Sequence, residues 1–409
     1  MLAYSGPGFL IAVGYMDPGN WATDLQGGAQ FGFNLLSVIM FSSVVAMFLQ
    51  YLCVKLGVAS ERDLAQICRE QYRKPVAMLM WVFAEIATVS TDMAEVVGSA
   101  IAMQLLFGLP LLAGCIITGL DVFIILYLQG RGFRYIESLI ITLIIIISAC
   151  LISEIYFSKP SLIGILIGFV PNTEIIKNST MLYMAIAIFG ATVMPHNLYL
   201  HSAIIQTRKY ERTVEGKREA IKFGTIDVVA ALTIALFINA AILIVSAATF
   251  HWSGHHDVAK IQDAYQLLTP ILGATAASVV FAIGLLASGQ QATFTGTLAG
   301  QVVMEGFLNI QITPWLRRMI TRLLAIVPAI VIIGYAGENQ ATSLLVASQV
   351  VLSLQLGFAV WPLMRFTGQK NRMGEFVNSI WTKIIGWSLT IIIIALNAKM
   401  VLDQVMILV

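Results

Sequence analysis

A carboxylate and a carboxamide flank a Pro-Gly pair near the start of the chain. Asp17 and Asn20 are three residues apart, so they can project to one side and offer two oxygen atoms to a cation. Pro18 removes a backbone donor and Gly19 adds backbone freedom, so a helix is predicted to break here. If the segment lies in a membrane, its carboxylate costs roughly 2.5 to 3.5 kcal/mol on insertion scales, which favours a bound cation as partner.

A second segment repeats this combination of helix breaker and potential ligand. Pro195 has no N–H, so the carbonyl of Ala191, four residues earlier, lacks its helical donor and is expected to be a free oxygen ligand. Met194, beside the proline, adds a thioether sulfur. Mg²⁺ and Ca²⁺ prefer oxygen ligands, whereas Mn²⁺, Fe²⁺ and Cd²⁺ tolerate or prefer softer donors. The sulfur is therefore expected to select transition metals.

A third group of residues could move protons. Glu85, Asp92 and Glu95 fall within an arc of about 80° on one helical face, because each residue turns a helix by about 100°. Acids on one buried stripe repel one another, which favours a proton relay over three fixed charges. His196, just after the second break, could pass or receive that proton. Three arginines are candidate counter-ions: Arg317, Arg318 and Arg322.

These groups must be positioned by long apolar helices, which the composition favours. Of the 409 residues, 58% are hydrophobic and 11% are charged, against roughly 25% charged in a soluble domain. About 20 apolar residues in a helix cross a bilayer core of about 30 Å. We predict eleven spans, at 7–32, 34–58, 76–107, 110–130, 136–157, 179–206, 221–250, 273–307, 319–336, 340–366 and 378–407. The predicted connecting loops at 60–75, 207–220, 251–272 and 367–377 are too short for a soluble domain.

The basic residues predict an orientation. With a cytoplasmic amino terminus and eleven spans, 20 of the 24 Lys and Arg residues fall on the cytoplasmic side. The other side keeps four, namely Lys159, Lys177, Lys260 and Lys399. This asymmetry predicts a cytoplasmic amino terminus and an extracellular carboxyl terminus.

Other features exclude several classes of protein. The net charge of +2 gives no nucleic-acid-binding surface, and the four cysteines form neither a CxxC motif nor a disulfide framework. The first apolar run has no basic n-region or small-residue cleavage site, so we interpret it as a span and not as a removable signal. Since the chain starts so close to this span, we expect that a natural amino-terminal tail is missing.

The two breaks fall in spans 1 and 6, five spans apart. Because five is odd, a duplication of spans 1–5 and 6–10 must have inverted topology. Paired broken helices at corresponding positions of two halves indicate the midplane site of a transporter. The predicted divisions are a first repeat at 1–158, a second repeat at 178–367 and an eleventh helix at 378–409.

The motifs at 17–20 (DPGN) and 194–196 (MPH) resemble those of the bacterial NRAMP divalent-metal transporters, the natural-resistance-associated macrophage protein family. The similarity includes 91–98 (TDMAEVVG) and 289–301 (GQQATFTGTLAGQ) and runs along the whole chain; one departure is Gly357, where the family pattern predicts proline. The resemblance implies an all-α polytopic membrane protein with the LeuT-like fold of two inverted five-helix repeats plus an eleventh helix. It also implies proton-coupled import of Mn²⁺ or Fe²⁺, and of Cd²⁺, across the plasma membrane by alternating access.

The resemblance also implies roles for particular residues. Carried over by position, the metal ligands would be Asp17, Asn20, Met194, the Ala191 carbonyl and a span-10 glutamine, which is Gln349 or its neighbour Gln355. The proton pathway would use Glu85, Asp92, Glu95 and His196. Arg317 and Arg318 are candidate members of this pathway from their position at the inner end of span 9. The metal ion would be the substrate and H⁺ the coupling ion, with no permanent cofactor, no obligatory protein partner and the lipid bilayer as surroundings.

Three other functions are alternatives. A Na⁺-coupled amino-acid carrier shares the predicted fold but needs no acid and thioether at one site. A membrane metal sensor could bind the ion without moving it. An intramembrane metalloenzyme is disfavoured, because the sequence has no HExxH motif and because His196 and His201 lie about 140° apart around a helix. We therefore do not expect an enzyme.

Overall fold

The computed structural model describes residues 6–120, 133–255, 260–272, 276–310 and 313–408, and every regular element in these ranges is helical. The side chains of a few further residues, including Arg317 and Arg318, lie outside the described part. The helices of the first half are α1 (Pro7–Gly14), α2 (Pro18–Phe31), α3 (Leu36–Ser60), α4 (Leu64–Gln71), α5 (Lys74–Phe107), α6 (Leu111–Thr118), α8 (Phe133–Ser158), α9 (Leu162–Gly168) and α10 (Glu174–Lys177). Those of the second half are α11 (Ser179–Thr192), α12 (Pro195–Ile204), α13 (Val214–Ser246), α14 (Ile261–Leu272), α15 (Ala277–Leu308), α16 (Pro314–Ala336), α17 (Ala341–Thr367), α18 (Lys370–Met373) and α19 (Ile380–Leu408).

Most predicted spans correspond to one long helix or one broken pair. Among the described residues, 8 helical stretches are long and apolar enough to cross a membrane, and Met319–Tyr335 is a shorter apolar helix. The predicted spans 1 and 2 contribute to a single stretch, Pro18–Ser60, with α1 as a short separate helix. The predicted span 110–130 is described only as far as α6, since residues 121–132 lie outside the described ranges.

Three predicted loops contain helices that the search for apolar runs missed. Helix α4 lies within 60–75, α14 lies within 251–272, and the short α18 lies within 367–377. Helix α4 is too short and polar to be a span, but a capping box starts it: Asp63 accepts from the N–H of Gln66, whose side chain accepts from the N–H of Asp63. Helix α13 begins at Val214 instead of residue 221, because Thr213 caps a polar first turn that precedes the apolar part.

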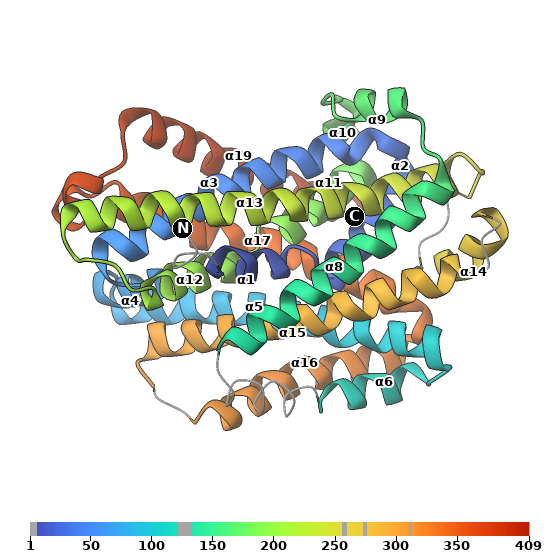
Figure 1. Cartoon of the computed structure of the whole chain (residues 1–409), viewed down its shortest axis with the longest axis horizontal. Coiled ribbons are helices and arrows are strands. Elements are labelled where there is room, and N and C mark those ends of the chain that lie inside the picture. The colour runs from blue at the N-terminus through green and yellow to red at the C-terminus, as the bar shows by residue number, and fades with distance from the viewer. Residues whose placement is uncertain (1–5, 121–132, 256–259, 273–275, 311–312, 409) are drawn as a thin grey trace.

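Figure 1 shows that the long helices run along the longest axis of the molecule, so their connections gather at two ends. Helix α4 and the start of α13 lie at the left end, and α9, α10 and α14 lie at the right end. The prediction places the first set of connections on the cytoplasmic side and the second on the extracellular side. The alternation between ends therefore agrees with the predicted order of spans.

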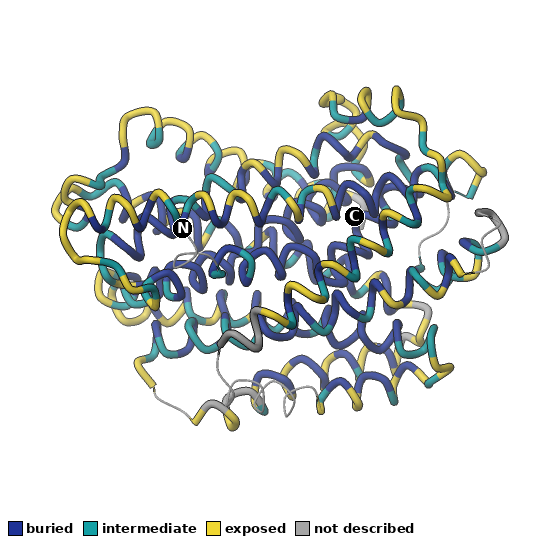
Figure 2. The backbone as a smooth tube through the Cα atoms, viewed as in Figure 1, coloured by how far each residue is buried: buried dark blue, intermediate teal, exposed yellow. Residues whose placement is uncertain are grey.

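Burial separates a central group of helices from an outer one. Helices α1, α12 and α17 lie in the buried middle of the molecule, whereas the outer faces of α8, α16 and α19 are exposed (Figure 2). The exposed side chains are large and apolar, such as Ile145 (62% exposed) and Ile391 (63% exposed). Apolar side chains on the outside fit helices that face lipid, so the polar residues concentrate inside the bundle.

Candidate metal site

The first helix break lies between α1 and α2, as predicted. Helix α1 ends at Gly14, and Asp17 is the N-cap of α2, where its Oδ1 accepts a 2.8 Å hydrogen bond from the N–H of Asn20. The carbonyl of Tyr15 accepts from Asn239 on α13 at 2.9 Å, and the carbonyl of Met16 accepts from Ser288 on α15. Side chains of neighbouring helices thus satisfy this part of the break.

The second break lies between α11 and α12. Helix α11 ends at Thr192, and Met194 is the N-cap of α12, whose first residue is Pro195. We expected the carbonyl of Ala191 to be free. Instead, it accepts a 3.2 Å hydrogen bond from the side-chain nitrogen of Asn20. One hydrogen bond therefore joins residues 171 positions apart, and the two broken helices meet at this point.

Asp17 and Asn20 form the centre of this junction and are almost fully buried. The side-chain nitrogen of Asn20 donates to Oδ1 of Asp17 at 2.9 Å as well as to Ala191, and its Oδ1 accepts from Asn239 at 3.3 Å. The Oδ2 of Asp17 has no hydrogen-bond partner among the described residues. A donor nitrogen therefore lies between two oxygens that a cation could bind.

Met194 and Gln349 lie at the edges of the junction. A Cβ built on Gly14, the last residue of α1, would lie 3.5 Å from the sulfur of Met194. A Cβ on Gly19 would lie 2.0 Å from the side-chain nitrogen of Gln349, so the span-10 glutamine touches the first break. Gln349 is fully buried and its Oε1 has no partner in the described part of the chain, whereas Gln355, the other residue we considered, is partly exposed.

Asp92 and Glu95 lie together against α15, with Arg322 of α16 as their counter-ion. A Cβ on Gly296 would lie 2.6 Å from Oδ1 of Asp92 and 2.9 Å from Oε1 of Glu95. Arg322 lies 3.3 Å from Glu95 in a buried ion pair and also donates to Thr293 at 3.1 Å. Among the described residues, Arg322 is the cation that pairs with this group, and it faces two acids, so the group has room for a proton.

Of the other predicted proton residues, the structure describes the side chains of His196 and Glu85. His196 Nδ1 lies 3.5 Å from the hydroxyl of Thr91, the residue before Asp92, and is buried. Glu85 is half-buried and lies seven residues before Asp92 on α5. The side chains of Arg317 and Arg318 lie outside the described part, so the structure does not place them.

Three residues of the site were not predicted from the sequence. Asn239 and Ser288 hold the first break, and the side-chain nitrogen of Asn197 lies 3.6 Å from the sulfur of Met194. All three are buried polar residues within apolar spans. That pattern was visible in the sequence, but it does not say which break a side chain faces.

A buried chain of polar side chains links α1, α3 and α12 beside the first break. The side-chain nitrogen of Gln50 donates to the Tyr15 hydroxyl at 2.8 Å, and Oε1 of Gln50 lies 2.8 Å from Nδ1 of His201. These contacts link α1, α3 and α12, so both broken helices are held to α3 here.

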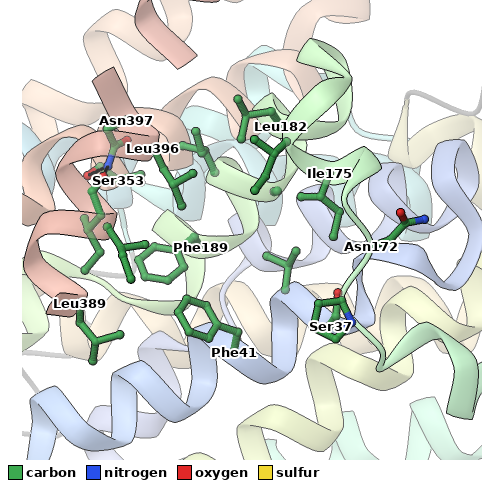
Figure 3. A pocket seen from close by; sticks show the side chains of 17 residues that line it. Ser37, Phe41, Asn172, Ile175, Leu182, Phe189, Ser353, Leu389, Leu396 and Asn397 are labelled. Atoms are coloured by element: carbon green, nitrogen blue, oxygen red, sulfur yellow. Dashed lines mark hydrogen bonds between the residues drawn. The ribbon is translucent and has the colours of Figure 1, made fainter. Parts of the chain in front are cut away.

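A cavity of about 260 Å³ lies beside the second break but does not serve as a cation site. Figure 3 shows that Phe41, Phe189, Leu389 and Leu396 line it, with Asn397 at its edge. Its walls come from α3, α10 and the residues before it, α11, α17 and α19, and they are almost entirely apolar. Carbon-lined space cannot replace the water around an ion, so the polar junction of the broken helices remains the candidate metal site.

The sequence matches one protein-family model over nearly its whole length. Residues 8–403 match the model described as "Natural resistance-associated macrophage protein-like". A similar protein from Nostoc sp., named divalent metal cation transporter MntH, is 58% identical over 404 residues, which cover 99% of this chain and 91% of the relative.

Solved structures extend the comparison to the fold. A manganese transporter of Eremococcus coleocola is 41% identical, with a TM-score of 0.89 over 97% of this chain and 85% of that one. Mhp1, described as a nucleobase-cation-symport-1 family transporter, is 14% identical, with a TM-score of 0.67 over 97% of this chain and 91% of that one. The second likeness concerns the fold alone, and the fold is the predicted LeuT-like one.

Proposed function

Since the chain belongs to the Nramp family, a family of membrane transporters of metal ions and not of enzymes, we propose that it imports Mn²⁺ and Fe²⁺, and accepts Cd²⁺, together with protons. The cation is the substrate, and H⁺ is the coupling ion. The protein works in the plasma membrane of a bacterium, with its amino terminus in the cytoplasm. The relatives described as divalent metal cation and manganese transporters support the metal.

The observation that carries this proposal is the junction of the two broken helices at Asp17, Asn20 and Ala191. The Asn20 nitrogen is an electropositive donor that lies between the carboxylate of Asp17 and the carbonyl of Ala191. A divalent cation would replace this donor and bind the same two oxygens. A turn of the Asn20 amide by half a revolution would present its Oδ1 to the cation as a third ligand.

Selectivity would come from the sulfur of Met194. Asp17, Asn20 and Ala191 alone would make an oxygen site that Mg²⁺ and Ca²⁺ could also use. A thioether adds affinity for Mn²⁺, Fe²⁺ and Cd²⁺ and adds little for the harder ions. Gln349, which packs against Gly19, is positioned to supply a further oxygen.

Proton coupling is supported by the acids on α5. Glu95 lies close enough to Asp17 for their charges to interact, and it pairs with Arg322. A cation bound at Asp17 and a proton held by Asp92 or Glu95 would therefore influence each other through a medium of low dielectric constant. This interaction links occupancy of the metal site to protonation of the acid pair.

Alternating access would follow from the broken helices. The inner halves α1 and α12 are linked to α3 through Tyr15, Gln50 and His201, whereas the outer halves α2 and α11 are joined to each other by the hydrogen bond from Asn20 to Ala191. Opening toward the cytoplasm would require this chain of hydrogen bonds to part. The bound cation would hold the two breaks together between the two openings.

The test is Mn²⁺ flux into proteoliposomes with the internal pH recorded at the same time. We expect Mn²⁺ entry with acidification of the lumen, and we expect Asp17→Ala to abolish both, because the carboxylate is the one charged ligand. Retained Mn²⁺ uptake by a folded Asp17→Ala protein would contradict the site. Leucine or glycine uptake stimulated by Na⁺ would instead support the amino-acid carrier.

A further inference from the structure

A second carboxylate lies on the outer half of the first broken helix. We propose that Asp24 binds the divalent cation transiently on the extracellular side and passes it to Asp17. The inference rests on the proposed import of a divalent cation and adds a step to it. Its basis is the position of Asp24 on α2, its burial and its missing hydrogen-bond partners.

Asp24 is buried like a core residue but lacks the bonds that such a group needs. It is 1% exposed, and neither of its carboxylate oxygens has a hydrogen-bond partner among the residues that the structure describes. By contrast, Oδ1 of Asp17 accepts two hydrogen bonds from Asn20. A carboxylate buried without partners is costly, so such a group calls for a compensating ligand.

No cation among the described residues forms an ion pair with Asp24. The charged group that acts on it most strongly is Asp17, which is itself an acid. A structural ion pair of the kind that Glu95 makes with Arg322 is therefore not the reason for this carboxylate. A mobile cation that passes both acids would be attracted by each of them.

Asp24 and Asp17 lie on the same face of α2. They are seven residues apart, which is nearly two helical turns, so their positions around the axis differ by about 20° and along it by about 10 Å. Asn20, which joins the two breaks, lies between them on the same side of the helix. In the proposed orientation Asp24 is the outer of the two acids, so an entering cation reaches it first.

Helix α13 lies along this part of α2 and brings further oxygens. The hydroxyl of Ser246 donates to the carbonyl of Leu25, next to Asp24, and Asn239 bonds to Asn20. The Oδ1 of Asn239 is buried and has no partner in the described ranges. Asp24, Asn239 and Asp17 thus offer carboxylate and amide oxygens as ligands along this part of α2.

An oxygen-lined step attracts divalent ions by charge and does not rank them by softness. Asp24 would therefore set how fast ions are captured, while Met194 would set which ions are kept. Removal of the Asp24 charge should slow the uptake of Mn²⁺ and Cd²⁺ by the same factor. A change at Met194 should alter their ratio.

The experiment measures initial uptake of radioactive Mn²⁺ and Cd²⁺ into proteoliposomes by full-length wild type, Asp24→Asn and Asp24→Glu. For Asp24→Asn we expect kcat/KM to fall about tenfold for both ions, with kcat changed less than about twofold. Asp24→Glu should recover most of the loss. Calorimetry should show that Asp24→Asn binds Cd²⁺ at the Asp17 site within about twofold of wild type.

Glu154→Gln is the matched control. Glu154 is also 1% exposed, and both of its oxygens lack partners in the described part, but it lies on α8 and not on the broken first helix. This variant should transport like wild type. Equal losses in Glu154→Gln and Asp24→Asn would show that any buried acid matters, and would overturn the relay.

Other results would also overturn the inference. Unchanged kcat/KM in Asp24→Asn, or a parallel loss of Cd²⁺ affinity at Asp17, would leave Asp24 no role as a separate step. If Asp24→Asn does not fold, the Asp17→Asn variant provides the test, since Asp24 should still bind Mn²⁺ weakly in it. Electron paramagnetic resonance detects this binding, and its absence would refute the proposal. A wild type that moves no Mn²⁺ would refute the proposed function itself.

Discussion

Among single residues, Asn20 organises the candidate site. Its side chain contacts Asp17 on its own helix, Ala191 on α11 and Asn239 on α13. A neutral amide can donate and accept at once, so it joins three helices without adding charge. The charge of the site therefore comes from Asp17, and the softness of the site comes from Met194.

At this scale we predict that Met194→Ala changes selectivity more than uptake. The affinity for Cd²⁺ should fall by more than about tenfold and that for Mn²⁺ by less than about threefold, because Cd²⁺ gains more from a thioether. The selectivity for Mn²⁺ over Ca²⁺ should decrease. Calorimetry with each ion measures these affinities.

Met184→Ala is the control, since Met184 is buried on α11 but precedes the second break by more than two turns. Equal losses for Cd²⁺ and Mn²⁺ in Met194→Ala would contradict the role of the sulfur.

Among the helices, the unbroken ones hold the broken ones in place. Helix α13 supplies Asn239 and helix α15 supplies Ser288 to the carbonyls of the first break. Farther along α15, Gly296 lets α5 approach, so that Asp92 and Glu95 lie against the helix backbone. Helix α15 thus contacts both the metal junction and the acid pair. Glycine at position 296 allows this close packing, because a larger side chain would collide with the two acids.

We therefore predict that Gly296→Ala impairs proton coupling more than metal binding. The new methyl would lie within 3.0 Å of both carboxylates, so the acid side chains must move, while Asp17 keeps its own contacts. Proton entry per Mn²⁺ should fall, and Cd²⁺ affinity should stay within about twofold. Gly300→Ala on the same helix is the control, because its methyl would meet the Thr88 methyl at 3.3 Å. The same flux and pH recording measures both variants; unchanged coupling in Gly296→Ala would contradict this prediction.

On the scale of the whole molecule, the site is enclosed from both directions. The candidate ligand side chains are at most 1% exposed, namely Asp17, Asn20, Met194 and Gln349. The polar chain through Gln50 lies at one side of the site. The surrounding helices have exposed outer faces (Figure 2), and large apolar side chains such as Ile145 on α8 and Ile391 on α19 lie there. A closed form with both breaks in contact is the state that a bound cation should favour.

This arrangement predicts that the substrate stabilises the protein against heat. Mn²⁺ at about 100 times its dissociation constant should add about 2.7 kcal/mol, because it binds the folded state and not the unfolded one. In detergent, Mn²⁺ should raise the melting temperature of wild type, a chelator should reverse the shift, and Asp17→Ala should show none. An equal shift in Asp17→Ala would mean that Mn²⁺ binds elsewhere.

The sequence by itself determined the membrane class, the positions of the long helices and the two breaks. Proline and glycine act on their own backbone, and apolar runs of span length are local properties, so both can be read without tertiary contacts. The same logic explains the errors. Helix α4 and the first turns of α13 depend on capping by Asp63 and Thr213, which a search for apolar runs does not detect.

Only the tertiary structure decided which partners those residues meet. The Ala191 carbonyl accepts from Asn20, 171 positions away, and the Tyr15 carbonyl accepts from Asn239, 224 positions away. Arg322 pairs with Glu95, although the sequence offered three arginines within six residues. Spacing along a helix fixes which face a residue takes, but the neighbour on that face is set by the packing of distant helices.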